Sequence, residues 1–283
     1  MHATFATQPP AGRPGTGILI LGASNVRRHR LHLVRWLSRR LPSPWHLILV
    51  AGHGRSYGRR NRVMGWRLPA IQDAAWVEPW RKLPVARRFA LVCDVGNDLM
   101  YGSDAEELAS WVLESAHRIG VCDQLTLAGL PIERAEMLVP WQFELFKRCF
   151  FPGCDRKLDP LRSEAKACDE RLAQWAESMQ WRWVQPPAWW YGWDPIHLRR
   201  AVRQEAWRDL IGLPEEIAEP PTFDPIGREQ YFLKKIFSGT TASTNRQWKA
   251  WSSMALEQTW GEWKLGHAQP IWRSSHGDTI AYY

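Results

Sequence analysis

The sequence predicts a three-layer α/β/α fold built around a parallel, five-stranded β-sheet. Continuous apolar runs, which suit strands buried on both faces of such a sheet, alternate along the chain with segments of helical periodicity. This alternation implies right-handed crossovers between parallel strands, with helices packed on both faces. Three of the apolar runs end at a glycine, which permits a tight turn at the end of each strand.

The elements are predicted in the following order. Residues 1–16 are rich in proline, glycine, alanine and threonine, and we expect a disordered arm. Strands are predicted at residues 18–21, 45–51, 89–95, 124–130 and 181–185. Helices are predicted at residues 27–41, 103–120, 141–150, 164–179 and 198–211. Residues 54–65 read as a polar, arginine-rich loop. A capping box formed by Ser103 and Glu106 opens the second helix, and Gly120 closes it.

Residues 17–212 hold all the predicted strands and form one predicted domain. Residues 213–283 differ from it, because four prolines between residues 214 and 225 interrupt the start of the segment and five tryptophans stand among polar residues further on. We predict an irregular, tryptophan-rich C-terminal extension with a short helix at residues 227–237. It contains no catalytic motif. It could pack back on the domain, or provide a surface for a protein partner or for self-association.

The formal charge of +8 lies entirely before residue 213, where 30 lysines and arginines face 21 acidic residues. Such an excess suits anionic substrates, nucleic acid or a membrane surface, but we favour an ordinary basic surface. Five cysteines without a CxxC pair indicate reduced thiols rather than disulfides or a metal site. No apolar run is long enough for a signal peptide or a membrane span, so we expect a soluble, cytoplasmic protein.

Short segments that follow the first three predicted strands contain groups suited to acyl transfer. Ser24 follows the first strand at the start of a helix, where free N–H groups can stabilise negative charge. Gly52 and Gly54 follow the second strand, and Asn97 follows the third. A glycine N–H and an asparagine amide can both bind an oxyanion. Because the carboxyl ends of parallel strands share one edge of the sheet, these groups can converge there.

A fourth segment contains Asp194 and His197, three residues apart with Pro195 between them. A general base needs a fixed tautomer, and Asp194 can accept the Nδ1–H bond and leave Nε2 facing Ser24. Each segment taken alone has an ordinary interpretation, as a helix cap, a tight turn, a turn-forming asparagine or a surface pair. All four in this order predict a serine hydrolase.

Residues near these segments are candidates for binding the substrate. Trp190 and Trp193 precede His197 and could form an apolar or sugar-stacking wall, with core packing as an equal alternative. Arg55 lies in the arginine-rich loop and could bind a carboxylate or phosphate group on the substrate. A solvated basic face is the more ordinary interpretation of that loop.

The four segments resemble blocks I, II, III and V of the SGNH hydrolases, also called the GDSL esterase and lipase family, over roughly residues 17–212. The resemblance implies that Ser24 is the nucleophile and that His197, oriented by Asp194, is the base. It implies three oxyanion donors, which are the Ser24 N–H, the Asn97 amide and a block II glycine N–H. It also implies a flavodoxin-like fold and neither a metal nor an organic cofactor.

Two segments depart from the family's pattern. Ala23 stands where block I usually has an aspartate, which is mainly structural. Gly52-His53-Gly54 fits block II imperfectly; we favour Gly54 as the donor, with Gly52 as the alternative.

The expected activity is hydrolysis of a carboxylic ester of a small molecule or glycan, with an O-acetyl or short acyl group, through an acyl-enzyme. One alternative is acyl transfer to an alcohol by the same residues. Another is a basic polyanion- or nucleic-acid-binding protein on an inactive hydrolase fold. The intact set of candidate catalytic residues argues against this second alternative, and we do not expect nucleic acid to be a partner.

Overall fold

A computed structural model describes residues 15–283 apart from 64–65, 216, 218–271 and 274–276. The strands of its main sheet are β1 Gly15–Leu21, β2 Trp45–Val50, β5 Val85–Val92, β6 Gln124–Ala128, β7 Arg182–Val184, β8 Trp272–Arg273 and β9 Thr279–Tyr282. A separate hairpin pairs β3 Asn61–Val63 with β4 Trp66–Leu68. The helices are α1 Ser24–Ser38, α2 Val77–Arg81, α3 Asn97–Met100, α4 Ala105–Ile119, α5 Ile132–Glu136, α6 Pro140–Phe150, α7 Leu158–Ser178 and α8 Arg203–Ile211, with the 3₁₀ turn η1 Ala188–Trp190.

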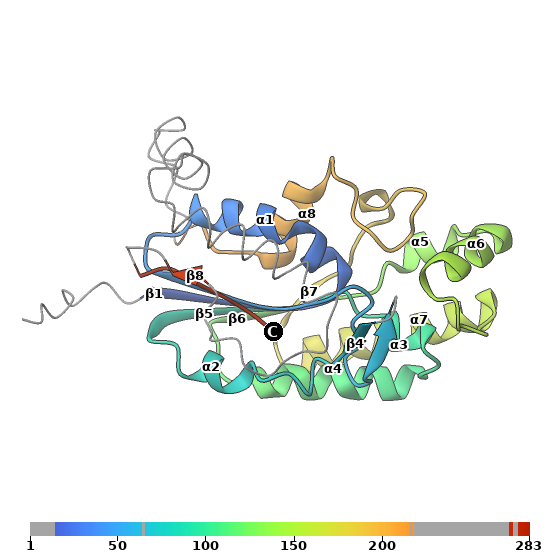
Figure 1. Ribbon diagram of the computed structural model, residues 1–283, viewed down its shortest axis with the longest axis horizontal. Coiled ribbons are helices and arrows are strands. Elements are labelled where there is room, and N and C mark those ends of the chain that lie inside the picture. Colours follow the sequence, from blue (N-terminus) through green and yellow to red (C-terminus); the bar gives the residue numbers. More distant parts are fainter. Residues whose placement is uncertain (1–14, 64–65, 216, 218–271, 274–276) are drawn as a thin grey trace, which may run out of the picture.

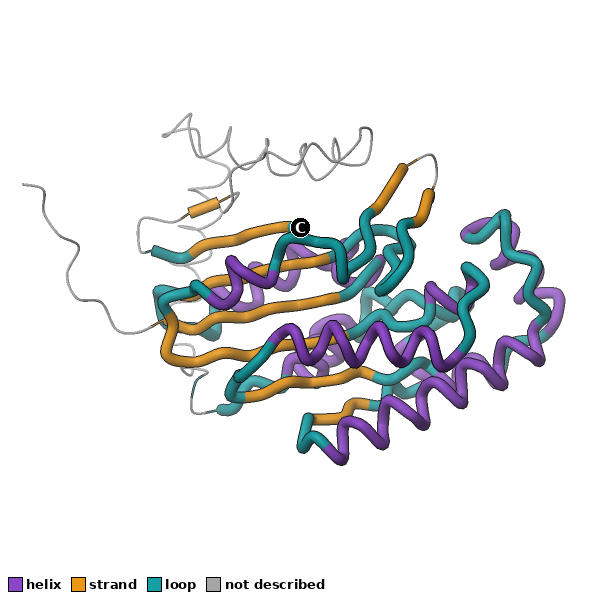
Figure 2. Tube along the Cα trace, turned by 90° about the horizontal axis from the view of Figure 1, so that it is seen from below, coloured by secondary structure: helices purple, strands orange, loops and turns teal. Residues whose placement is uncertain are grey.

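The main sheet has the strand order β7-β6-β5-β1-β2-β9-β8, and Figure 2 shows these strands side by side. Every neighbouring pair is parallel except β8 and β9. The five strands predicted from the sequence have the order 2-1-3-4-5, which is the flavodoxin-like arrangement. The predicted fold class is confirmed. The topological switch point, where such folds bind ligands, lies between β1 and β5.

Helices cover both faces of the sheet, with α1 and α8 on one face and α2, α4 and α7 on the other (Figure 1). All seven residues of β1 are buried, which explains its continuous apolar run. Because side chains alternate along a strand, Ile18 and Ile20 pack in the core beside α1 and α8. Leu19 and Leu21 pack in the core beside α4 and α7. The sheet therefore separates two apolar cores.

The segment predicted as a C-terminal extension supplies two strands to the main sheet, so the expected number of five is too low. Strand β9 runs parallel to β2, with His46 opposite Thr279. Its position is secured by the N–H of Trp45, which donates to the Asp278 carboxylate at 3.0 Å. The Tyr282 hydroxyl donates to the carbonyl of Ala51 at 2.9 Å. Most of residues 213–283, including the predicted helix at 227–237, lies outside the described residues.

Other element boundaries also differ from the predictions. Gly15 and Thr16 belong to β1 rather than to the predicted arm, and the rest of that arm lies outside the described residues. The predicted arginine-rich loop contains the first strand of the β3–β4 hairpin. The last helix begins at Arg203 instead of residue 198, because Leu198 forms a β-bridge with Tyr191.

The start of α4 was predicted one residue too early. Asp104, rather than Ser103, is the N-cap, and its carboxylate accepts a hydrogen bond from the N–H of Glu107 at 2.8 Å. Ser103 is buried instead, and the predicted capping box with Glu106 is not formed. The predicted end is correct, because Gly120 takes φ +74°, a conformation that favours glycine.

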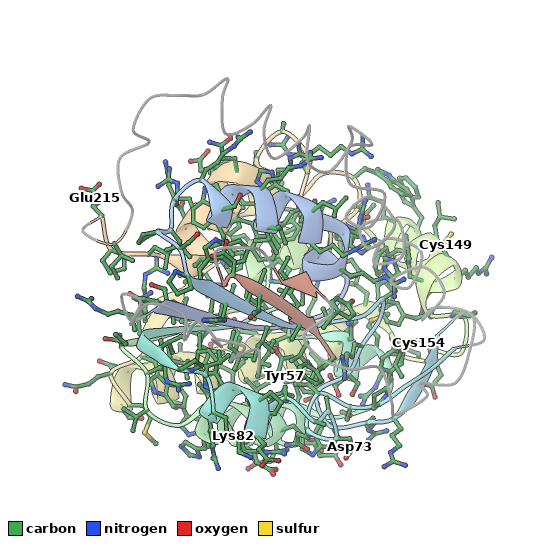
Figure 3. The ribbon with its side chains drawn as sticks, turned by 60° about the vertical axis from the view of Figure 1, so that its left-hand side comes forward. Tyr57, Asp73, Lys82, Cys149, Cys154 and Glu215 are labelled. Carbon is green, nitrogen blue, oxygen red and sulfur yellow. The ribbon has the colours of Figure 1, made fainter. Side chains whose placement is uncertain are left out.

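None of the helices in the described part of the chain combines the length and apolar character needed to cross a lipid bilayer. All five cysteines are described, and all are free thiols. Cys149 is exposed and Cys154 is partly exposed (Figure 3). The remaining three are buried or partly buried, so the chain carries no disulfide among its own cysteines.

A buried carboxyl links α7 to the end of β6. Asp169 in α7 is 9% exposed and accepts a hydrogen bond from the N–H of Leu130 at 2.6 Å. Gln185 donates to the carbonyl of the same Leu130, also at 2.6 Å. Burial raises the pKa of Asp169 to about 6, because removal from water disfavours the charged form.

We expect this carboxyl to make the stability of the fold depend on pH. An acid whose pKa is higher in the folded state binds more protons there, so stability is greatest below the unfolded pKa and falls as pH rises to about 6. Asparagine does not ionise, so the stability of the Asp169→Asn variant should not fall with pH in this way. Urea unfolding at a series of pH values should show the variant gaining up to about 3 kcal/mol relative to the unmodified chain between about pH 4 and 6. A difference that is constant over this range would contradict the assignment.

Candidate active site

Three side chains predicted to act together form a hydrogen-bonded chain at the carboxyl edge of the sheet. The Oγ of Ser24, the first residue of α1, lies 2.9 Å from Nε2 of His197. Nδ1 of His197 lies 2.6 Å from the carboxylate of Asp194. Ser24 and His197 are each 7% exposed. With the proton on Nδ1, Nε2 accepts from the serine hydroxyl, so the arrangement can move a proton from Ser24 to His197.

Asp194 is held as a carboxylate by its surroundings. Its second oxygen accepts hydrogen bonds from the N–H groups of Ile196 at 3.2 Å and His197 at 3.3 Å. Partial burial opposes ionisation, but the hydrogen bond and charge of His197, together with these N–H groups, lower the pKa of Asp194. The guanidinium of Arg28 lies 3.8 Å away. The carboxylate is therefore ionised at neutral pH and can orient the imidazole ring.

Asp94, which the sequence analysis did not single out, holds the first turn of α1. Its carboxylate accepts hydrogen bonds from the N–H groups of Ala23 at 2.9 Å, Asn25 at 2.9 Å and Val26 at 3.3 Å. The N–H of Ser24 makes no hydrogen bond within the described part of the chain. The helix cap is thus Asp94, so the hydroxyl of Ser24 is used for the bond to the imidazole rather than for capping. The Ser24 N–H stays available to bind an anion.

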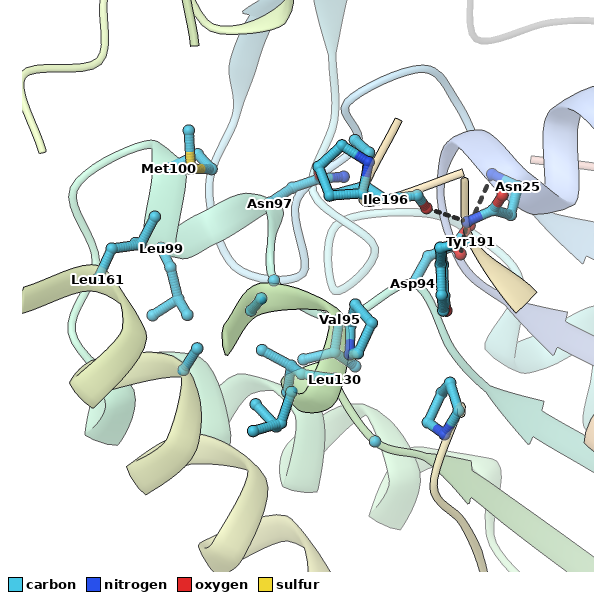
Figure 4. Close-up of a pocket in the computed structure, with 18 of the residues that line it drawn as sticks. Asn25, Asp94, Val95, Asn97, Leu99, Met100, Leu130, Leu161, Tyr191 and Ile196 are labelled. Atoms are coloured by element: carbon cyan, nitrogen blue, oxygen red, sulfur yellow. Dashed lines mark hydrogen bonds between the residues drawn. The ribbon is translucent and has the colours of Figure 1, made fainter. Parts of the chain in front are cut away.

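Asn25 connects the turn that carries Ser24 to the segment that carries His197. Its side-chain amide donates to the carboxylate of Asp94 at 2.8 Å and to the carbonyl of Ile196 at 2.9 Å (Figure 4). Its side-chain oxygen accepts from the N–H of Leu198 at 2.9 Å. Ile196 and Leu198 are the two neighbours of His197, so Asn25 fixes the backbone on both sides of that residue. In the sequence, the only indication of a role for Asn25 is its position directly after Ser24. No sequence pattern indicates which residues it binds.

The turn after β5 uses two uncommon backbone conformations. Asp94 has φ +55°, a left-handed conformation that aspartate tolerates better than most residues. Gly96 has φ +130°, which requires glycine. This turn places the Asp94 carboxylate against α1 and starts α3 at Asn97. The strained backbone therefore lies at the switch point, beside the candidate catalytic residues.

The predicted oxyanion donors lie on α3 and on the loop after β2. The Asn97 amide donates to the carbonyl of Arg55 at 3.0 Å, and an amide has a second N–H to offer. Gly54 has φ +61°, and its carbonyl accepts from the Tyr101 hydroxyl at 2.8 Å. The carbonyl of Gly52, the alternative donor, accepts from the N–H of Arg55 at 3.3 Å. Hydrogen bonds from Asn97 and Tyr101 thus tie this loop to the end of β5.

Asp98 completes the attachment of the same loop. Its buried carboxylate accepts hydrogen bonds from the Ser56 hydroxyl and from the N–H groups of Tyr57 at 3.0 Å and Gly58 at 3.4 Å. Burial raises the pKa of Asp98. The hydroxyl of Tyr57 (Figure 3) lies 2.7 Å from the carbonyl of Cys93 at the end of β5. The loop that carries the glycines is therefore fixed to the strand that carries Asn97.

The structure corrects part of the predicted substrate-binding set. Arg55 is fully buried, and its guanidinium donates to backbone carbonyls, including that of Tyr283, so the prediction that it binds substrate is wrong. The reason is that its loop folds inward. Trp190 is 2% exposed and packs in the core beside α1 and α8, which supports the core-packing alternative. Trp193 is 56% exposed beside Trp189 in a shallow hollow, and its role stays a prediction.

An apolar cavity of about 150 Å³ opens beside Ser24 and Asn97 (Figure 4). The sequence analysis did not predict it, because its walls come from separate helices and loops that meet only in the folded chain. Most of the lining side chains are apolar, and they include Leu99, Met100, Leu130, Phe143, Phe146, Phe151, Leu158 and Leu161. Among the described residues, no group of three or more histidine, cysteine, aspartate or glutamate side chains is arranged to hold a metal ion.

This chain is similar to known proteins in its structure but not detectably in its sequence. No protein-family model matches the sequence, and no curated protein matches it. A carbohydrate acetylesterase family member from Sinorhizobium meliloti is similar at a TM-score of 0.43 and 13% identity, over 70% of this chain and 100% of its own. The aryl esterase of M. smegmatis gives 0.42 and 14%, over 69% and 99%. A lipolytic G-D-S-L family member from Veillonella parvula gives 0.41 and 11%, over 67% and 92%. This last structure comes from the family that the sequence segments resemble.

We expect a fluorophosphonate probe to label Ser24, because a hydroxyl that is hydrogen-bonded to an imidazole base is an activated nucleophile. Labelling should disappear in Ser24→Ala and persist in Ser38→Ala, a serine at the other end of the same helix. Peptide mass spectrometry identifies the labelled residue. Label on another residue, or equal labelling of the Ser24→Ala variant, would contradict the site.

Asn25→Ala should slow this labelling by about a hundredfold, because a base displaced by about 1 Å loses activity on that scale. Labelling rates of the variant and the unmodified chain are compared over a range of pH. The thermal unfolding temperature of the same samples shows whether the variant is folded, so that misplacement of His197 can be told from unfolding. An unchanged rate in the folded variant would show that Asn25 does not position His197.

Proposed function

We propose that the protein is a serine esterase of the SGNH type, acting on carboxylic esters of small molecules or glycans through an acyl-enzyme. The observation that supports this most strongly is the chain of hydrogen bonds from Ser24 through His197 to Asp194. The three residues come from two distant segments of the chain, and Ser24 and His197 are 173 positions apart. Acyl transfer of this kind requires a hydroxyl, an imidazole and a carboxylate in contact. The switch point of the sheet, where these three lie, is where such folds bind ligands.

In the first half of the reaction, Ser24 Oγ attacks the ester carbonyl while His197 Nε2 accepts the hydroxyl proton. Asp194 stabilises the imidazolium that forms and keeps its ring in position. His197 then donates the proton to the departing alcohol oxygen, which leaves the acyl group on Ser24. In the second half, His197 activates a water that attacks the acyl-enzyme, and the acid is released.

The negative charge of each tetrahedral intermediate requires hydrogen-bond donors directed at the developing oxyanion. The N–H of Ser24 meets this requirement, since Asp94 binds the N–H groups on either side of it and no described residue accepts from it. The second N–H of the Asn97 amide is another donor, because its partner Arg55 takes one hydrogen. On the resemblance of its loop to block II, Gly54 stays the predicted third donor. These groups are held before substrate binds, so little reorganisation accompanies the reaction.

Hydrolysis of short-chain 4-nitrophenyl esters tests the proposal. Ser24→Ala and His197→Ala should lose nearly all turnover, and Asn97→Ala should raise the barrier by about 3–4 kcal/mol through loss of one oxyanion donor. His117→Ala is the matched control, because His117 is exposed on α4 on the opposite face of the sheet. Turnover in Ser24→Ala equal to that of the unmodified chain would overturn the proposal.

A further inference from the structure

The apolar cavity beside Ser24 is not used by the mechanism above. We propose that it is an acyl-chain pocket, and that the preferred substrates are esters of uncharged, apolar acids of about six carbons rather than acetyl esters. This inference rests on the proposed function. It departs from the sequence-based expectation of an O-acetyl or short acyl group.

The size and lining of the cavity define the group that fits. A volume of about 150 Å³ lined by leucine and phenylalanine side chains equals that of engineered protein cavities that bind benzene, a six-carbon molecule. Phe143, Phe146 and Leu158 are all at least 90% buried, so the wall is set by packing rather than by loose surface side chains. An acetyl group would leave most of this space unfilled.

The charged groups that line the cavity, Arg162 and Asp94, have partners within the protein, which argues against a charged acyl chain. Arg162 is the cation among the lining residues, but its guanidinium already binds the carboxylate of Asp159 and the carbonyls of Ala135 and Leu138. The carboxylate of Asp94 is taken by the first turn of α1. A dicarboxylic or aminoacyl chain would therefore bring an uncompensated charge into an apolar space.

The position of the cavity assigns it to the acyl part of the ester rather than to the alcohol. Ser24 and Asn97, the attacking group and an oxyanion donor, are among the residues that line it, whereas His197 is not. The departing alcohol must be beside Nε2 of His197, because that atom protonates it. The acyl chain, which stays bonded to Ser24 after the alcohol has left, therefore extends into the cavity.

Two series of esters test which part of the substrate fills the cavity. In the first series, 4-nitrophenyl esters carry acyl chains from acetyl to dodecanoyl. In the second, acetyl esters carry alkyl alcohols of the same lengths. We expect kcat/KM in the first series to rise by about fourfold for each buried methylene up to about six carbons, and then to fall. The second series should show no such maximum. A maximum at acetyl, or a maximum in the alcohol series alone, would overturn the proposal.

Two variants change the size of the cavity and one controls for substitution in the same helix. Ala165→Leu adds a larger side chain to the cavity wall in α7, and should lower the hexanoate-to-acetate ratio of kcat/KM at least about tenfold. Leu161→Ala enlarges the cavity and should move the preference to longer chains. Ala167→Leu changes an exposed residue of the same helix and should leave the ratio unchanged. Unchanged ratios in both cavity variants, with circular dichroism showing folded protein, would contradict the assignment.

The outcomes separate this inference from the proposed function. Absence of Ser24-dependent hydrolysis for every ester would mean that the proposed function fails. Ser24-dependent hydrolysis with acetate as the best substrate, unaffected by either cavity variant, would retain the esterase and remove the acyl-chain pocket.

Discussion

The carboxylate of Asp94 binds the first turn of α1 and the side chain of Asn25 at the same time. Through the turn it sets the direction of Ser24, and through Asn25 it sets the backbone on both sides of His197. The alignment of Ser24 and His197, the candidate nucleophile and base, thus depends on one residue just after β5, in a left-handed conformation. In the family that the sequence resembles, block I usually carries an aspartate at the position of Ala23. Here a carboxylate reaches the same turn from the neighbouring strand.

Buried strands and the ends of three of them could be predicted from sequence, because apolar runs that stop at glycine reflect burial on both faces of a parallel sheet. This placed Ser24, Asn97 and the glycine loop at one edge. The roles of Asp94 and Asn25 could not be predicted, since they depend on contacts between residues far apart in the chain. Strand β9 was missed for a related reason, because four residues carry too little pattern to identify a strand that pairs with β2.

Arg55 shows how the last strand is connected to the candidate oxyanion site. Sequence alone suggested a solvent-facing arginine, since its neighbours are polar and charged. Its guanidinium is instead buried against the carbonyl of Tyr283, which follows β9, while its own carbonyl accepts from the Asn97 amide. The burial lowers the pKa of Arg55 to about 10, still well above neutral pH, so the cation persists. The same residue therefore links the residue after β9 to a candidate oxyanion donor on α3.

The central claim is that Ser24 attacks a carbonyl whose oxygen is received by the Ser24 N–H and the Asn97 amide, with the acyl chain in the cavity. A crystal structure of the protein after reaction with a hexyl phosphonate ester tests it most directly. The account predicts a covalent bond from phosphorus to Ser24 Oγ, a phosphonyl oxygen about 2.7–3.1 Å from both donors, and the hexyl chain among the phenylalanine side chains. A phosphonyl oxygen directed to solvent, or a hexyl chain outside the cavity, would contradict it.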